Sequence, residues 1–196
     1  MTDINNILKI KTNNISPAKG KVLISEPFLL DYYFKRSVVL LAEHNEEGSF
    51  GLIVNKPVEW KLSKVLKGFP DFDAPVYIGG PVKTDSLFFI HTRGDIIENS
   101  MEILDGLYWG GDIEIVKELI LINRITSNEI KFFVGYSGWV ANQLEDELER
   151  NSWLVSKIKP QQIMKPDTEN LWDDTLKQLG DDYSYWTNFP SDPAMN

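Results

Sequence analysis

The chain has 196 residues, 42% of them hydrophobic, which is enough for a sizeable buried core and suggests one main domain. Its formal charge of -9, from 29 acidic and 20 basic residues, argues against nucleic-acid binding, because phosphate contacts need clustered Lys and Arg. The lack of cysteine excludes disulfides, thiolate nucleophiles and Cys-ligated metals. With no signal-peptide pattern and no apolar run long enough to span a bilayer, a soluble cytoplasmic protein without membrane contact is expected.

The domain is expected to span residues 20–180, between an N-terminal arm of residues 1–19 and a C-terminal tail of residues 181–196. Pro17 interrupts the apolar pattern of the arm, which is expected to be a short helix or an ordered segment. The tail has two prolines and no hydrophobic period, so it is expected to be a strap laid on the domain or to be disordered.

The first half of the domain is rich in predicted strands. Residues 22–25 form the first of them. Two apolar runs, 37–42 and 50–54, then predict a hairpin, and Gly48 in their connection suits a turn that needs positive φ. The spacing of apolar residues in 61–67 predicts a short helix.

The second half alternates strands with helices. The sequence Gly-Tyr-Ser-Gly-Trp at 135–139 is predicted to turn the chain, and Asn142 followed by Glu145 resembles a capping box. Because strands arrive in pairs with connections too short for parallel crossovers, the expected fold class is α+β with a mixed, bent sheet. The predicted elements are strands at 76–78, 87–90, 103–109, 131–134 and 153–156, and helices at 112–124, 142–151 and 170–179.

The two histidines are the first candidates for chemistry. His44 and His91 each follow an apolar run, so they could meet at one rim of the sheet, with Glu43 or Asp95 completing an acid–base pair or a metal site. A metal needs three or four convergent ligands, and the spacing here specifies none. Separate, hydrogen-bonded or exposed histidines are therefore the favoured interpretation, and no metal site is predicted.

Glycine-containing segments give weaker signals. The 135–139 sequence resembles the G-x-S-x-G nucleophile motif, but Trp139 stands in place of its last glycine, so a structural turn is favoured over a Ser137 nucleophile. Trp139 is expected in the core or as the wall of a groove. The pair Gly79 and Gly80 lacks the residues of a phosphate-binding loop, so turn geometry is favoured, and no cofactor is predicted.

The remaining candidates are polar residues near the ends of predicted elements. They could line a polar cleft with Trp139 as its wall, or they could simply satisfy one another, Arg36 pairing with a carboxylate such as Asp31 while Asn55 and Gln143 tie loops together. The second interpretation is favoured. No catalytic residue is assigned, and the candidates for ligand or partner binding are Arg36, His44, Asn55, Gly79, Gly80, His91, Trp139, Gln143 and Glu147.

Several segments together resemble the YqgE/AlgH family of bacterial proteins. They are SEPFLLDYYFKRSVVLLAEHNEEGSFGLIVNKPV, YIGGPV, GYSGWVANQLEDELERNSWLV and LWDDTLKQLG, in order over roughly residues 20–180. The resemblance implies a single α+β domain whose mixed sheet bends into a partly closed barrel flanked by helices. Members are mostly uncharacterised. One is named for an effect on expression of alginate-biosynthesis genes, although the family carries no recognised DNA-binding module.

Two departures from the family pattern weaken a catalytic interpretation. Val140-Ala141-Asn142 replaces a common Gly-Pro-Gly, and Ser137 stands where Ala is frequent. We therefore expect a non-enzymatic regulatory or binding protein, acting through a protein partner or a small ligand and with at most an indirect role in transcription. The alternative is a hydrolase or metal-dependent enzyme using His44 or His91 in a polar cleft, which requires these groups to converge. Direct nucleic-acid binding is the least favoured.

Overall fold

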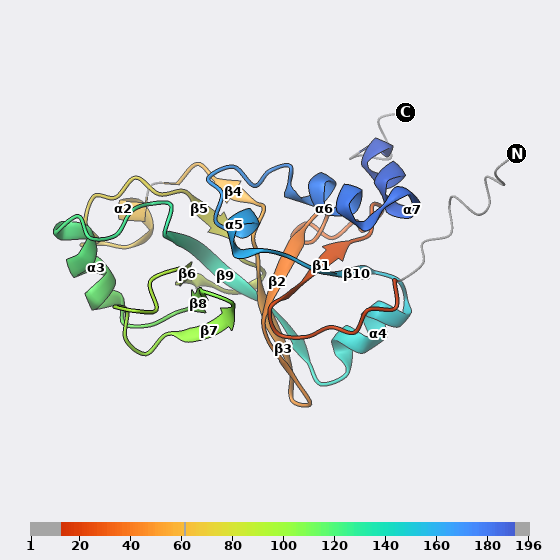
Figure 1. The fold of residues 1–196 in the computed structure, drawn as a ribbon, viewed down its shortest axis with the longest axis horizontal. Helices are drawn as coiled ribbons and strands as arrows, with labels where there is room; N and C mark the ends of the chain where they lie inside the picture. Colours follow the sequence, from red (N-terminus) through yellow and green to blue (C-terminus); the bar gives the residue numbers. More distant parts are fainter. Residues whose placement is uncertain (1–12, 61, 191–196) are drawn as a thin grey trace, which may run out of the picture.

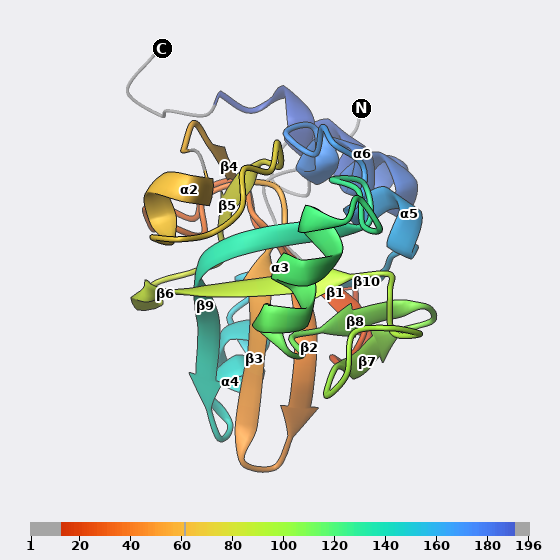
Figure 2. The same ribbon diagram turned by 90° about the vertical axis from the view of Figure 1, so that its left-hand side faces the viewer.

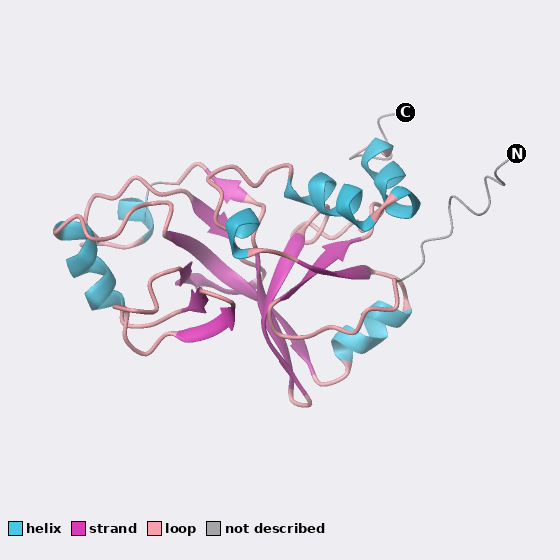
Figure 3. Cartoon of the chain, viewed as in Figure 1, coloured by secondary structure: helices cyan, strands magenta, loops and turns pink. Residues whose placement is uncertain are grey.

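A mixed, ten-stranded sheet with short helices packed on it forms the molecule, as the computed structural model shows for residues 13–60 and 62–190 (Figures 1 and 3). The α+β class with a mixed sheet is thus confirmed. Along the main path the strand order is β10-β1-β2-β3-β9-β6-β8-β7, and β4 and β5 lie off it. This path runs from β10 to β7 without closing, so the barrel part of the expectation is not confirmed.

The strands account for the apolar runs of the sequence. Their bounds are β1 (Lys21–Ser25), β2 (Val38–Asn45), β3 (Gly48–Ile53), β4 (Pro57–Val58), β5 (Val76–Ile78), β6 (Val82–His91), β7 (Met101–Leu104), β8 (Leu107–Trp109), β9 (Ile130–Val140) and β10 (Trp153–Lys157). The helices are α2 (Leu62–Val65), α3 (Ile113–Leu121), α4 (Gln143–Glu149), α5 (Pro160–Ile163), α6 (Leu171–Leu179), α7 (Asp181–Ser184) and the 3-10 helix η1 (Tyr185–Asn188).

Strand β9 is the centre of the fold, and the prediction of a turn at 135–139 was wrong. β9 pairs antiparallel with β3 and β6 and parallel with β5, which makes the sheet mixed. It continues through 135–139 because Gly135, at φ 70°, lets it bend instead of turning back (Figure 2). The bend allows one strand to pair with β5 and β6 over one part of its length and with β3 over the other.

Other boundaries differ from the predictions for local reasons. The expected edge strand at 103–109 is a hairpin of β7 and β8, because Gly106, at φ 71°, permits a tight turn after Asp105. The β2–β3 connection shrinks to a two-residue turn, which leaves His44 inside β2 and Gly48 at the start of β3.

The ends of the helices differ in how they are capped. Asp112 caps α3, its side chain accepting a hydrogen bond from the Glu114 N–H. The capping box at Asn142 was wrong, because this residue is left-handed at φ 65° and its side chain caps nothing. The Gln143 side-chain oxygen instead accepts a hydrogen bond from the Val140 N–H at 3.1 Å.

Three apolar clusters make up the core of residues 13–60 and 62–190, and β9 contributes to each. Phe133 belongs to the first, which includes residues of β1, β2 and α6. Phe132 belongs to the second, beneath α2 and α3, and Trp139 to the third, beneath α4. Because neighbouring residues of a strand point to opposite faces, a single strand can serve several clusters.

The C-terminal segment, described as far as Pro190, packs onto the first cluster. Trp186 of η1 is only 1% exposed, and the Phe189 ring lies 4.9 Å from that of Phe28. The segment therefore covers the start of the domain. No helix in the described residues is both long and apolar enough to cross a membrane.

Candidate ligand-binding groove

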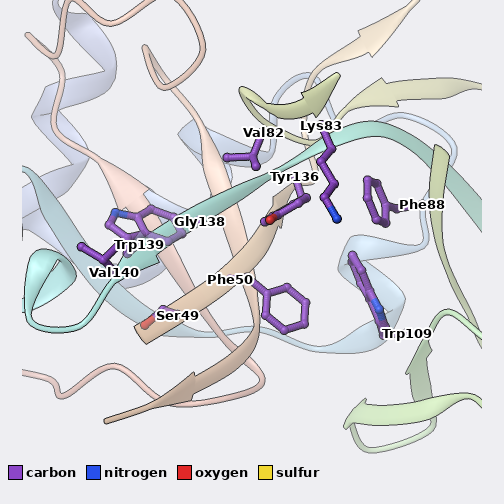
Figure 4. Close-up of a pocket in the computed structure, with 10 residues that line it drawn as sticks. All are labelled: Ser49, Phe50, Val82, Lys83, Phe88, Trp109, Tyr136, Gly138, Trp139 and Val140. Carbon is purple, nitrogen blue, oxygen red and sulfur yellow. The ribbon is translucent and has the colours of Figure 1, made fainter. Parts of the chain in front are cut away.

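A cavity of about 510 Å³ opens between β3, β6, β8 and β9 (Figure 4). These strands come from distant parts of the chain, and the sheet register brings them together. The residues around the cavity are Ser49, Phe50, Val82, Lys83, Phe88, Trp109, Tyr136, Gly138, Trp139 and Val140. We call this cavity the aromatic groove.

Four partly exposed aromatic side chains form the floor of the aromatic groove. The Phe88 and Trp109 rings are stacked with centroids 5.5 Å apart, and Phe50 meets Trp109 edge to face at 5.2 Å. The Tyr136 ring completes the floor. Its centroid lies 5.4 Å from that of Phe88 and 6.2 Å from that of Phe50. Such edge-to-face and offset contacts hold the rings in place while leaving apolar surface open to the cavity.

Gly138 keeps one end of the groove open. It lies directly opposite Phe50 in the pairing of β3 with β9, and its φ is not in the left-handed region. A Cβ atom added there would stand 3.2 Å from the Tyr136 ring and 3.8 Å from Val82. The missing side chain, and not backbone freedom, is therefore what this glycine contributes.

Among the described residues, Lys83 is the one charged residue around the groove. Its backbone is left-handed, with φ 49°, where the register of β6 against β9 shifts between Val82 and Leu87. Its side chain reaches down between Tyr136 and Phe88 (Figure 4). Irregular strand positions of this kind often re-aim a side chain, and left-handed backbone at a non-glycine residue is strained.

On the opposite face of the same strands, Ser49 and His44 form a pair that faces α4. Because Ser49 neighbours Phe50 in β3, its side chain points away from the aromatic floor. Its Oγ lies 2.7 Å from Nδ1 of His44, and Nε2 of His44 lies 3.8 Å from Glu145 of α4. The order resembles a serine–histidine–carboxylate triad, but the carboxylate is beyond hydrogen-bond distance and the hydroxyl does not face the groove.

The candidates Gln143 and Glu147 of α4 meet Trp139 of β9 where the helix packs on the sheet, and they satisfy one another. One carboxylate oxygen of Glu147 accepts hydrogen bonds from the indole N–H groups of Trp139 (2.9 Å) and Trp153 (2.7 Å). The other accepts one from the Gln143 amide at 3.0 Å. Since both tryptophans are buried, this network locks α4 onto the sheet.

Arg36 and Asn55 lie at the other end of β3, so the less favoured alternative, a polar cleft that unites them with Gln143 and Glu147, does not form. Asn55 accepts a hydrogen bond from the Val38 N–H (2.8 Å) and donates one to the Arg36 carbonyl (2.9 Å), which ties two loops together. The Arg36 guanidinium donates to the Phe189 carbonyl and lies 4.9 Å over the Trp172 ring, instead of pairing with Asp31.

His91 stands apart from His44. It pairs with Ile130 at one end of β9, whereas Ser49, the partner of His44, pairs with Trp139 near the other end, roughly 30 Å along the strand. The histidines therefore do not converge, although the alternative of an enzyme site built from both requires that they do. No group of three His, Asp or Glu side chains that could hold a metal occurs within 13–60 and 62–190.

The surroundings of His91 define its tautomer. The Arg93 N–H donates to Nδ1 at 3.1 Å, so Nδ1 must be the unprotonated acceptor, and Nε2–H donates to the Gly110 carbonyl at 2.9 Å. Burial lowers the pKa of this imidazole, while the hydrogen bond to Gly110 opposes the effect.

Gly79 and Gly80 are explained by a close approach of two backbones. A Cβ atom added at Gly79 would lie 2.2 Å from the Gly135 carbonyl oxygen, and one added at Gly80 would lie 2.4 Å from the Tyr136 backbone. The Gly79 N–H donates to Val134, and its carbonyl accepts from Ser137 Oγ. Both glycines therefore let their loop pass close to the backbone of β9, where a side chain would clash.

A buried lysine that is not among the predicted candidates lies in the core. Lys131 Nζ donates to the Tyr77 hydroxyl at 2.9 Å and sits 4.3 Å above that ring. Burial lowers the pKa of Lys131 to about 7. The residue is 1% exposed and is not among those around the groove, so it is a core lysine held by its partner.

Of the residues around the groove, Trp139 is a candidate predicted from the sequence, whereas the four floor rings, Lys83 and the role of Gly138 are not. Their only sequence signals are an aromatic or a lysine in a predicted strand, which also fits an ordinary core or surface position. What joins them is the register of β3, β6, β8 and β9, which periodicity does not reveal.

Comparisons with known proteins place the chain among relatives of similar length. It is 46% identical to a UPF0301 protein of Parabacteroides distasonis over all of both chains, and 45% identical to one of Chlorobaculum parvum over 90% of this chain and 95% of the relative. The crystal structure of a Corynebacterium diphtheriae protein matches 89% of this chain and 94% of its own with TM-score 0.74 at 24% identity, which supports the fold alone.

The solution structure of the AlgH protein from Pseudomonas aeruginosa is also similar. It matches 91% of this chain and 98% of its own, with TM-score 0.70 and 30% identity. The sequence pattern of the AlgH-like family matches residues 22–184. The chain therefore belongs to the AlgH-like family.

Proposed function

We propose that this protein is a non-enzymatic binding protein whose ligand occupies the aromatic groove. The observation that carries the proposal is a cavity of about 510 Å³ floored by four partly exposed aromatic rings. This volume lies within the roughly 300–1,000 Å³ typical of small-molecule sites. An exposed patch of aromatic surface often indicates a binding site, because its exposure to water is unfavourable when no partner covers it.

A regulatory role would follow from ligand occupancy and would be indirect with respect to transcription. The net charge of -9 opposes DNA, and α4 carries Glu145, Asp146 and Glu149 among its few residues. The protein would then act through a protein partner or through the ligand itself.

Thermal-shift screening against small-molecule ligands tests the proposal. A ligand that binds the folded state raises the unfolding temperature of the wild-type chain. Gly138→Val, which fills the groove, should abolish the shift, whereas Leu121→Ala should preserve it, because Leu121 is 69% exposed on α3 outside the groove. Equal shifts in wild type and Gly138→Val would contradict the proposal, provided that the variant unfolds cooperatively without ligand.

Hydrolysis is the second candidate, and one observation favours it: the 2.7 Å contact between Ser49 Oγ and Nδ1 of His44. It ranks lower because the hydroxyl faces α4. Turnover of short p-nitrophenyl esters that is lost in both Ser49→Ala and His44→Ala, with folding preserved, would displace the proposal of a binding function alone. Turnover unchanged in both variants, or absent from the wild type, would remove this candidate.

A further inference from the structure

We infer that the ligand of the aromatic groove is a small organic anion with a planar apolar body, an inference that rests on the proposed function and specifies its ligand class. Three independent features of the groove lead to this chemistry. They are its charge, its hydrogen-bonding groups and the shape of its floor.

The charge of the groove is positive. Lys83 is the one charged residue around it, and within the described residues its ammonium makes no ion pair or hydrogen bond. An acidic protein with a net charge of -9 has many carboxylates available, yet none neutralises this lysine. An anionic ligand would supply the missing partner through a charge-assisted hydrogen bond.

The hydrogen-bonding groups of the groove are mainly donors. The indole N–H of Trp109 can only donate, and the Tyr136 hydroxyl can donate as well. Neither group has a hydrogen-bond partner in the part of the chain that the structure describes. Of the residues that the structure describes, none with a carboxylate lines the cavity to accept a hydrogen bond from a ligand cation. An ammonium ligand would meet the aromatic floor but would be repelled by Lys83, so anions are favoured over cations.

The floor suits a flat, apolar body. Phe88 and Trp109 are stacked with only 27° between their planes, so the aromatic surface of the floor suits a planar body that continues the stack. A planar ligand could lie on this surface with its acidic group toward Lys83. The cavity of about 510 Å³ has the size of a small-molecule site, whereas macromolecular interfaces bury larger and flatter surfaces.

Two fluorescent probes share one aromatic body and differ in charge. Comparing their affinities separates the contribution of the anionic group from that of the aromatic body. The anionic probe is 8-anilinonaphthalene-1-sulfonate, and the neutral probe is N-phenyl-1-naphthylamine, which lacks the sulfonate. Each is titrated against the full chain at pH 7 in low salt. We expect the anionic probe to bind about tenfold more tightly, and we expect this advantage to shrink as added salt screens the charges.

Three variants locate the effect. Lys83→Gln should weaken the anionic probe about tenfold and leave the neutral one within about twofold, since only the sulfonate loses its partner. Lys157→Gln, an exposed lysine on β10 away from the groove, should change neither affinity. Gly138→Val should weaken both probes, because it fills the cavity that their common body occupies.

The outcomes distinguish this inference from the proposed function. If Gly138→Val weakens both probes but Lys83→Gln changes neither, the groove binds apolar bodies and the anion inference is overturned while the proposed function stands. If neither probe binds, or if Gly138→Val leaves both affinities unchanged, the groove is not the site and both proposals fail. Circular dichroism of each variant confirms that it is folded before its affinity is interpreted.

Discussion

The two faces of the β3–β9 strand pair differ in how completely their side chains are satisfied. On the face covered by α4, the tryptophans and Glu147 form a closed set of hydrogen bonds. On the groove face, the rings of Phe50 and Tyr136 remain partly exposed, and the nearby Lys83 has no polar partner among the described residues. Neighbouring positions of the same two strands thus serve the fold on one side and lie open to a ligand on the other.

This difference teaches that polar residues are not by themselves the best guide to a site. Of the polar candidates, Asn55, Gln143 and Glu147 already make the hydrogen bonds that their environment requires. The groove offers open aromatic surface and unused donors instead. Groups whose hydrogen bonds are already satisfied should therefore matter for stability, and groups without a partner should matter for binding. Four variants test this division, from the largest expected effect on stability to the smallest.

The largest loss is expected for Glu147→Ala. Removing the carboxylate leaves two buried indole N–H groups without an acceptor, at about 1–3 kcal/mol each, so a total of about 3 kcal/mol is expected. Urea unfolding measures it. Glu149→Ala is the matched control, because Glu149 is exposed on the same helix and should change stability by less than about 0.5 kcal/mol. Equal effects of the two substitutions would contradict the structural role of Glu147.

Asn55→Ala is expected to cost about 2 kcal/mol. The substitution removes the acceptor of the Val38 N–H and the donor to the Arg36 carbonyl while leaving the groove intact. Urea unfolding gives the stability, and probe affinity should stay unchanged once the variant is shown to be folded. Asn128→Ala, at an exposed position, is the control. A loss of probe affinity without a loss of stability would return Asn55 to the list of binding residues.

His91 should contribute an acid-sensitive share of stability. Its pKa is lowered in the folded state, so below the unfolded value of about 6.5 the folded chain binds fewer protons than the unfolded one. The contribution of His91 to the free energy of unfolding is complete above about pH 6.5. Below that pH it declines by at most about 1.4 kcal/mol per pH unit.

The difference in unfolding free energy between wild type and His91→Gln should therefore narrow as the pH falls from 7 to 5. Urea unfolding at each pH measures it, and acid effects from other groups cancel in the difference. A constant gap over this range would show that His91 does not titrate as its burial predicts.

The smallest change is expected for Lys83→Gly, and it should have the opposite sign. Glycine relieves the left-handed backbone at φ 49°, for a net gain of about 0.5–1 kcal/mol after its own entropy cost. The same substitution should remove the preference for the anionic probe. Lys157→Gly, in ordinary strand geometry on β10, should lose stability instead. A destabilised Lys83→Gly would mean that this lysine already makes a stabilising contact.

Much of the architecture was predictable because local pattern and tertiary structure agree. The run at 37–42 is wholly buried, and all of it except Ser37 lies in β2. Asp112 caps helix α3, which begins at the next residue. The prediction failed at 135–139, because two glycines that usually signal a turn here permit a bend and an open groove within one strand. It failed again at 103–109, where Asp105-Gly106 is a hairpin signal that the apolar run obscured.

The candidate site was not predictable in the same way. Phe50, Phe88 and Trp109 belong to three strands, and their contacts depend on how β3, β6 and β8 are arranged around β9. Sequence pattern specifies that a residue is apolar and buried or half-buried, but not which distant ring it meets. The register shift that begins next to Lys83 likewise appears only once β6 is paired with β9.

The position of β1 has a consequence for the order in which the chain can fold during synthesis. β1 lies between β2 and β10, and Lys21 pairs with Lys157. At roughly 5–20 residues per second, translation must continue on the order of ten seconds after β1 emerges before β10 follows. Until then one edge of β1 has no partner. Folding of the nascent chain should therefore finish only after the last strand is made, and shielding of that edge by a chaperone would reduce aggregation.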